Sequence, residues 1–147
     1  MTKRELLEQL WAMEREDPIS KIKQPSDILP ALQKYVKRKQ EEFIVVTLDG
    51  VHSIIKVRSI TKGLVNKTVL HPREVFRPAI QDNATAIILA HNHPSGNVDP
   101  SAEDGAVTKR LRAAGEILGI AVLDHLIVGS RGYYSYLESG GFSADVN

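Results

Sequence analysis

A short apolar run sets the architecture that this chain can adopt. Residues 85–90 read Thr-Ala-Ile-Ile-Leu-Ala and lead directly into His91. The run is far shorter than the roughly 18 residues of a membrane span, and it is typical of a strand that is buried on both faces. A strand without a polar face needs packing partners on both sides of its sheet. The sequence therefore predicts an α/β fold with helices on both sides of the sheet.

The flanking segments supply the elements that such a fold requires. Apolar side chains recur at helical spacing in four segments: residues 3–15, 26–36, 71–80 and 101–118. Runs rich in β-branched residues predict strands in six segments: residues 43–48, 51–60, 64–70, 85–91, 120–128 and 133–137. Ser26 is expected to cap the second helix, and Asp49-Gly50 predicts a tight hairpin between the first two strands. The expected sheet is mixed, largely antiparallel and curved.

Length and composition favour one domain with an arm. The 147 residues suit a single domain, which we place at residues 26–140, after a helical arm and linker at 1–25 and before a tail at 141–147. The sequence shows neither a membrane span nor a secretory signal, so a cytoplasmic protein is expected. Cysteine is absent, which excludes disulfides and thiol nucleophiles and leaves His, Asp and Glu as the ligands for any metal.

Two histidines follow the apolar run at a spacing that suits metal binding. Side chains two residues apart on an extended backbone point to the same side, so His91 and His93 can bind one ion. Asp104 is well placed as a third ligand if the loop folds the start of the next helix back over the strand end. This set leaves a fourth tetrahedral position for water, as in catalytic zinc sites. It also describes the ligand set of non-haem iron enzymes.

Ser101 has two interpretations. Ser-x-x-Asp before an apolar helix matches a capping box, in which Ser101 is the N-cap and fixes the helix start that holds Asp104. A hydroxyl at that position can also donate a hydrogen bond toward a developing oxyanion. The two roles are compatible.

The remaining histidines carry weaker signals. His52 and His71 are expected to be structural, one beside the hairpin turn and the other at a helix entry. Asp124 and His125 adjoin on a strand and so face opposite sides of the sheet. One of them can orient a ligand imidazole, and the alternative is a role in the core.

The spacing of these residues resembles the JAMM motif of the MPN (JAB) metalloprotease family, which is His-x-His, seven residues, then Ser-x-x-Asp. The segments Asn92-His93-Pro94-Ser95-Gly96 and Asp124-His125-Leu126-Ile127-Val128-Gly129 resemble the RadC-like bacterial branch of that family. The resemblance covers residues 26–138. It implies a JAB/MPN-like, cytidine deaminase-like architecture and a zinc-dependent hydrolase that cleaves a peptide or isopeptide bond in a peptide or protein substrate.

The resemblance also implies roles for individual residues. In the family, two His and an Asp bind zinc, a Ser steadies the tetrahedral intermediate, and a Glu at the start of an upstream strand is the general base. Residue by residue, these roles fall on His91, His93, Asp104, Ser101 and Glu42. Glu42 directly precedes Phe43. If the register of this strand differs, Glu41, which points the opposite way, or Glu74 is the alternative base.

A DNA-associated module is an alternative from another class. RadC-like proteins carry a historical association with DNA repair, and residues 1–70 hold thirteen basic and nine acidic side chains. Against direct DNA binding, residues 1–40 are too short for the amino-terminal helical domain of those proteins and lack its Gly-rich hairpin. A metal-free scaffold is a further alternative, although every motif position is filled. The hairpin edges and the 3–15 helix offer surfaces for a homodimer.

Overall fold

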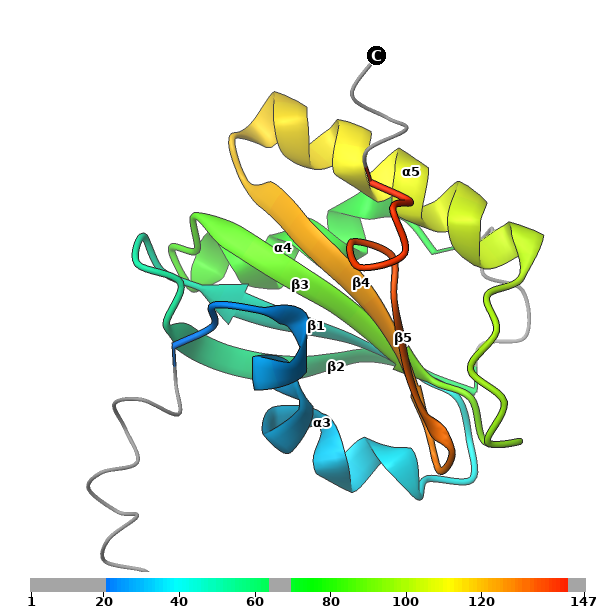
Figure 1. Ribbon diagram of the computed structural model, residues 1–147. Coiled ribbons are helices and arrows are strands. Elements are labelled where there is room, and N and C mark those ends of the chain that lie inside the picture. The colour runs from blue at the N-terminus through cyan, green and yellow to red at the C-terminus, as the bar shows by residue number, and fades with distance from the viewer. Residues whose placement is uncertain (1–20, 64–69, 143–147) are drawn as a thin grey trace, which may run out of the picture.

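In the computed structural model, residues 21–63 and 70–142 are described. They form a five-stranded open sheet in the order β2-β1-β3-β4-β5, in which β3 and β4 are parallel and the other neighbours are antiparallel (Figure 1). The strands are β1 (Glu42–Leu48), β2 (Ile54–Lys62), β3 (Ala86–Asn92), β4 (Ala121–Gly129) and β5 (Gly132–Ser135). The helical elements are η2 (Pro25–Ile28, a 3-10 turn), α3 (Leu29–Val36), α4 (Pro72–Gln81) and α5 (Ala102–Leu118). The α/β class and the mixed, mostly antiparallel sheet are confirmed.

Two expected elements lie outside the described residues, and two expected boundaries are corrected. The 3–15 helix and the 64–70 strand, apart from buried Leu70, are not among the described residues. The second helical segment starts at Pro25, with the Asp27 carboxylate accepting from two backbone N–H groups, so Ser26 is not its cap. The β1–β2 turn spans residues 49–53, because the Asp49 side chain accepts from the backbone of Val51 and Ser53.

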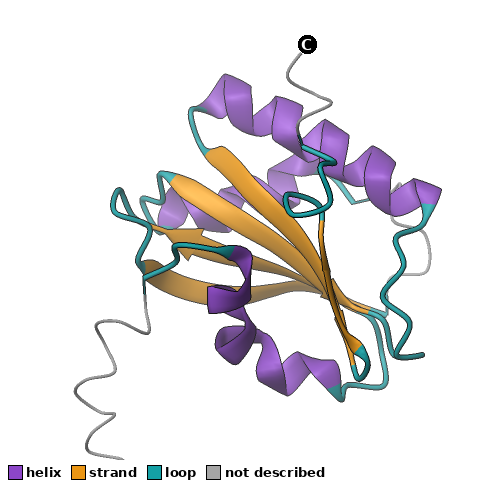
Figure 2. Cartoon of the chain, viewed as in Figure 1, coloured by secondary structure: helices purple, strands orange, loops and turns teal. Residues whose placement is uncertain are grey.

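Strand β3 is buried along its whole length, as the apolar run predicts. One face packs against α3 through residues that include Leu32, Ile44 and Ile88. The other face packs against α4 and α5 and includes Leu89 and Leu111. Figure 2 shows the helices on both sides of the sheet. Within the described residues, no helix combines the length and the apolar character that crossing a bilayer requires.

Strand alternation assigns each polar residue near the end of β3 to one face. Ile87 and Leu89 lie in the core beneath α4 and α5, whereas Ile88 and Ala90 lie in the core beneath α3. His91 therefore belongs to the α5 face. The next residue, Asn92, belongs to the α3 face, where its side-chain oxygen accepts from the backbone N–H of Glu42 at 2.7 Å.

Asp82, at the end of α4, ties this helix to the sheet. Its carboxylate accepts hydrogen bonds from the Arg58 guanidinium on β2 and from the Thr47 hydroxyl on β1, the latter at 2.8 Å. Arg58, followed by Thr47, lowers the pKa of Asp82 to about 2 against the opposing effect of burial. Because this pKa lies below its unfolded value, the ionised carboxylate stabilises the fold above about pH 4 and loses that effect as the pH falls toward about 2.

We expect Asp82→Asn to lower the free energy of unfolding by about 1–2 kcal/mol at neutral pH, since charge-assisted hydrogen bonds are lost. The difference from the wild type should shrink as the pH falls from about 4 to about 2. Urea denaturation at a series of pH values measures it, with Glu116→Gln, an exposed acid on α5, as the control. A difference that stays constant down to pH 2 would contradict the role of the ion pair.

Candidate metal centre

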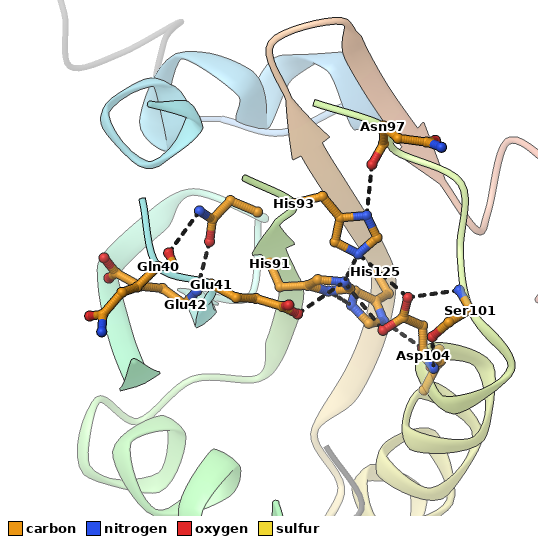
Figure 3. A network of polar contacts seen from close by, with 11 residues as sticks. Gln40, Glu41, Glu42, His91, His93, Asn97, Ser101, Asp104 and His125 are labelled. Carbon is orange, nitrogen blue, oxygen red and sulfur yellow. Dashed lines mark hydrogen bonds and ion pairs between the residues drawn. The ribbon is translucent and has the colours of Figure 1, made fainter. Parts of the chain in front are cut away.

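Four side chains converge at the carboxyl end of β3 (Figure 3). Glu41, His91, His93 and Asp104 each offer one ligand atom, and these atoms all lie within 4.8 Å of one another. They come from the residue before β1, the end of β3, the loop after β3 and the first turn of α5. Residues that are distant in sequence therefore meet at one point between the sheet and the start of a helix.

The start of α5 fixes the position of Asp104. The backbone N–H of Asp104 donates to Ser101 Oγ at 3.0 Å, and the backbone N–H of Ser101 donates to Asp104 Oδ2 at 2.8 Å. These reciprocal bonds form the capping box that the sequence predicts. The Asp104 side chain has no solvent exposure. Its carboxylate is therefore held in one orientation, toward the two histidines.

The spacing of three ligand groups, two imidazoles and one carboxylate, fits a metal ion. His91 Nε2 lies 3.0 Å from His93 Nε2 and 3.3 Å from Asp104 Oδ1, and His93 Nε2 lies 3.6 Å from Asp104 Oδ2. Ligand atoms at about 2.0–2.1 Å from a tetrahedral zinc ion are about 3.3 Å apart. The three distances bracket this value. The two histidines and the aspartate are thus spaced as the ligands of a zinc ion are.

The hydrogen bond of His93 leaves a lone pair on the nitrogen that faces the cluster. Its Nδ1 lies 2.8 Å from the backbone oxygen of Asn97. A carbonyl oxygen only accepts, so Nδ1 carries the hydrogen and Nε2 of the neutral imidazole carries the lone pair. Metal-binding histidines commonly have their other nitrogen engaged in this way.

The structure brings Glu41, and not Glu42, into the cluster. Glu41 Oε2 lies 3.8 Å from His91 Nε2. The Glu42 carboxylate lies on the α3 face, where it accepts from Arg38 at 2.6 Å and from the Ser59 hydroxyl at 2.8 Å. The expected placement of Glu42 at the metal site is thereby corrected. The sequence could not fix the face, because the residues that follow, Phe43-Ile44-Val45-Val46, are apolar on both faces.

Glu74 lies outside the cluster as well. Its carboxylate accepts from the backbone N–H of His71 at 3.1 Å, so it serves the start of α4. His71 is the N-cap residue of this helix, as expected for a helix-entry histidine. His52 lies in the β1–β2 turn with a positive φ of 63°. Neither histidine contributes to the cluster.

The cluster has a buried side and an accessible side. The side chains of His91 and Asp104 have no exposure, whereas those of His93 and Glu41 are 17% and 23% exposed. A bound molecule can therefore approach past His93 and Glu41. The two buried residues are suited to hold an ion rather than to contact solvent.

Asp124 and His125 have separate roles on β4. The buried Asp124 carboxylate accepts from the Ser135 hydroxyl and from the backbone N–H of Leu137, which ties β4 to β5 and the segment after it. Burial raises the pKa of Asp124, although these hydrogen bonds oppose the shift. His125 faces the cluster, and its Nε2 lies 2.8 Å from His91 Nδ1. Of the two residues, His125 is the one that contacts a candidate ligand.

Comparison with known proteins agrees with the family resemblance of the sequence motifs. A family model described as RadC-like JAB domain matches residues 22–141. A UPF0758 protein of Staphylococcus haemolyticus is 46% identical over 139 residues, which cover 94% of this chain and 60% of the relative. A UPF0758 protein of Methanospirillum hungatei is 53% identical over 105 residues, which cover 71% of this chain and 46% of the relative. The chain thus spans about half of the length of these relatives.

Because its carboxylate bonds to Arg38 and Ser59, Glu42 is expected to act on stability alone. Glu42→Gln should lower the free energy of unfolding by about 1 kcal/mol and leave zinc affinity unchanged. Urea denaturation and a zinc titration of the same samples measure the two quantities. A folded Glu42→Gln protein with weakened zinc binding would place this carboxylate at the metal centre after all.

Proposed function

Since this chain belongs to the RadC-like JAB domain family, we propose that it is a zinc-dependent hydrolase that cleaves a peptide or isopeptide bond in a peptide or protein substrate. The proposal rests above all on the convergence of two imidazole nitrogens and a buried carboxylate at 3.0–3.6 Å. Such a set leaves room for water, which distinguishes catalytic zinc sites from closed structural ones.

His91 Nε2, His93 Nε2 and the Asp104 carboxylate would hold the ion. When bound, zinc lowers the pKa of a coordinated water to about 7 and polarises a carbonyl group. The three residues have different environments: His91 and Asp104 are buried, and His93 is partly exposed. This arrangement fixes the ion from the protein side and leaves the side of His93 and Glu41 for the substrate.

Glu41 is the general base in this proposal. Its Oε2 is 3.8 Å from His91 Nε2, farther than the 3.0–3.6 Å that separate the atoms of the three ligand groups, and its side chain is partly exposed. A carboxylate beside the ion, rather than bonded to it, can take a proton from the attacking water. The same group then donates that proton to the leaving amine. Glu41 thus takes the role that the family resemblance alone assigned to Glu42.

Ser101 supports both the fold and the chemistry. Its Oγ accepts from the backbone of Asp104 while the residue itself is exposed. An accepting hydroxyl keeps its own proton, which it can donate to the carbonyl oxygen of the substrate as negative charge develops there. Ser101 therefore stabilises the transition state from a position fixed by the helix start.

Removal of a ligand tests the metal assignment. His91→Ala and Asp104→Ala are each expected to lose the single zinc ion per chain, because the two remaining ligands hold it too weakly. Elemental analysis after dialysis against zinc measures the content. His71→Ala and Asp99→Ala change the same residue types outside the cluster and should retain the ion. Iron in place of zinc in the purified wild type would favour the non-haem iron alternative.

The turnover of a Glu41 variant tests the assignment of the general base. Glu41→Gln should retain zinc and lose about 10²–10⁴-fold in turnover, since proton transfer is impaired. Glu42→Gln is the matched control, one residue away with its side chain on the other face, and should keep wild-type turnover. Mass spectrometry of a proteome-derived peptide library and of lysine-linked isopeptide conjugates measures cleavage. Full activity of Glu41→Gln, or cleavage that persists after zinc is removed, would contradict the proposal.

A further inference from the structure

We propose that His125 and Thr108 form a directional hydrogen-bond chain that sets the tautomer of His91 and so presents its Nε2 lone pair to the metal. This inference rests on the proposed metal site and names two positioning residues outside the ligand set. They lie on different elements, β4 and α5, and both are buried. Neither is part of the cluster of candidate ligands.

The chain runs from the metal site back to α5. His91 Nδ1 lies 2.8 Å from His125 Nε2, and Figure 3 labels both residues beside the cluster. His125 Nδ1 contacts the Thr108 hydroxyl, and this hydroxyl lies 2.7 Å from the backbone oxygen of Asp104. Thr108 follows Asp104 by one helical turn, so both residues lie on the buried face of α5.

The last acceptor fixes the direction of every bond. A backbone carbonyl only accepts, so the Thr108 hydroxyl donates its one hydrogen to Asp104. Thr108 must then accept from His125 Nδ1–H. A neutral imidazole carries one N–H, so His125 Nε2 accepts from His91 Nδ1–H. The lone pair of His91 is thereby placed on Nε2, the atom that faces the cluster.

The geometry of His93, combined with this lone pair of His91, supports a cation at this point. The Asn97 carbonyl places the lone pair of His93 on Nε2, and the Nε2 atoms of the two histidines are 3.0 Å apart. Two lone pairs at this distance repel each other, and the Asp104 carboxylate adds negative charge beside them. A positive ion among the three groups converts this repulsion into attraction.

Aromatic packing keeps His125 in place. Its ring stacks on Tyr136, with centroids 5.2 Å apart, and meets the edge or face of Phe43 at 5.7 Å. Phe43 also stacks on His91. This packing opposes rotation of the rings. The direction of the hydrogen bonds therefore decides which nitrogen of His91 carries the hydrogen.

Thr108→Val tests the chain at its far end, without a direct contact to His91. Valine matches the shape of threonine and lacks the hydroxyl, so His125 Nδ1–H loses its acceptor. His125 then moves its hydrogen to Nε2 and donates to His91 Nδ1, which forces the hydrogen of His91 onto Nε2. We expect zinc affinity to fall about 10–100-fold, as is typical when the partner of a ligand is lost. Thr108→Ser keeps the hydroxyl and should match the wild type.

Two readouts on the full chain measure the effect. Competition with a chromophoric chelator gives the zinc dissociation constant. Nitrogen-15 NMR of the histidine side chains in the zinc-free protein identifies which nitrogen of His91 carries the hydrogen, and a packing change alone would not move it. The wild type and Thr108→Ser should show hydrogen on Nδ1, and Thr108→Val on Nε2. If Thr108→Val does not fold, His125→Phe, which keeps an aromatic ring and removes the acceptor, takes its place.

The outcomes separate this inference from the proposed function. If the wild type binds zinc and the folded variant binds it equally well with an unchanged His91 tautomer, the chain is refuted and the hydrolase proposal stands. A second outcome is that the wild type binds no zinc, while His91 carries its hydrogen on Nδ1 in the wild type and on Nε2 in Thr108→Val. The hydrogen-bond chain then stands and the metal site is refuted.

Discussion

A histidine with no solvent exposure, at the end of a strand without a polar face, must satisfy both ring nitrogens within the protein. His91 does so at Nδ1 through a partner on β4, and its Nε2 lies among groups that would share the proposed ion with it. Its Nδ1 faces His125 on β4, and its Nε2 faces His93 and Asp104. The pairing of β3 with β4 and the return of α5 over the end of β3 are thus both needed to bury this imidazole. The site depends on the same contacts as the sheet.

The start of α5 joins stability to chemistry in a similar way. The bonds between Ser101 and Asp104 begin the helix and also orient the carboxylate toward the histidines. One turn later, Thr108 bonds back to the Asp104 carbonyl and contacts His125. One face of α5 therefore provides both the candidate ligand Asp104 and Thr108, which acts on the candidate ligand His91 through His125. The partly exposed members of the cluster, His93 and Glu41, lie on its accessible side.

The sequence predicts those features that depend on local spacing. The buried strand, the His91–His93 pair and the Ser101–Asp104 capping box all follow from alternation or from helix capping, and the structure has each of them. The choice between Glu41 and Glu42 depends on which face of β1 turns toward α5. The alternation of that strand does not reveal this, because both of its faces are apolar.

The contribution of His125 depends on strand register, which has no local signature. Its pairing with Leu89 follows an irregularity between Ile87 and Ile88, and a shift by one residue would turn it to the other face. Thr108 likewise appears in the sequence as one polar residue in a helix. The spacing of four from Asp104 was a usable signal, since it places both residues on the same helical face.

The proposed function requires that the two Nε2 atoms and the Asp104 carboxylate share one metal ion. Anomalous diffraction at the zinc edge, from crystals of the zinc-loaded protein, tests it most directly. We expect one anomalous peak at about 2.0–2.1 Å from His91 Nε2, His93 Nε2 and an Asp104 oxygen. A peak elsewhere, an ion bound through His91 Nδ1, or the absence of any ion from this cluster would contradict it.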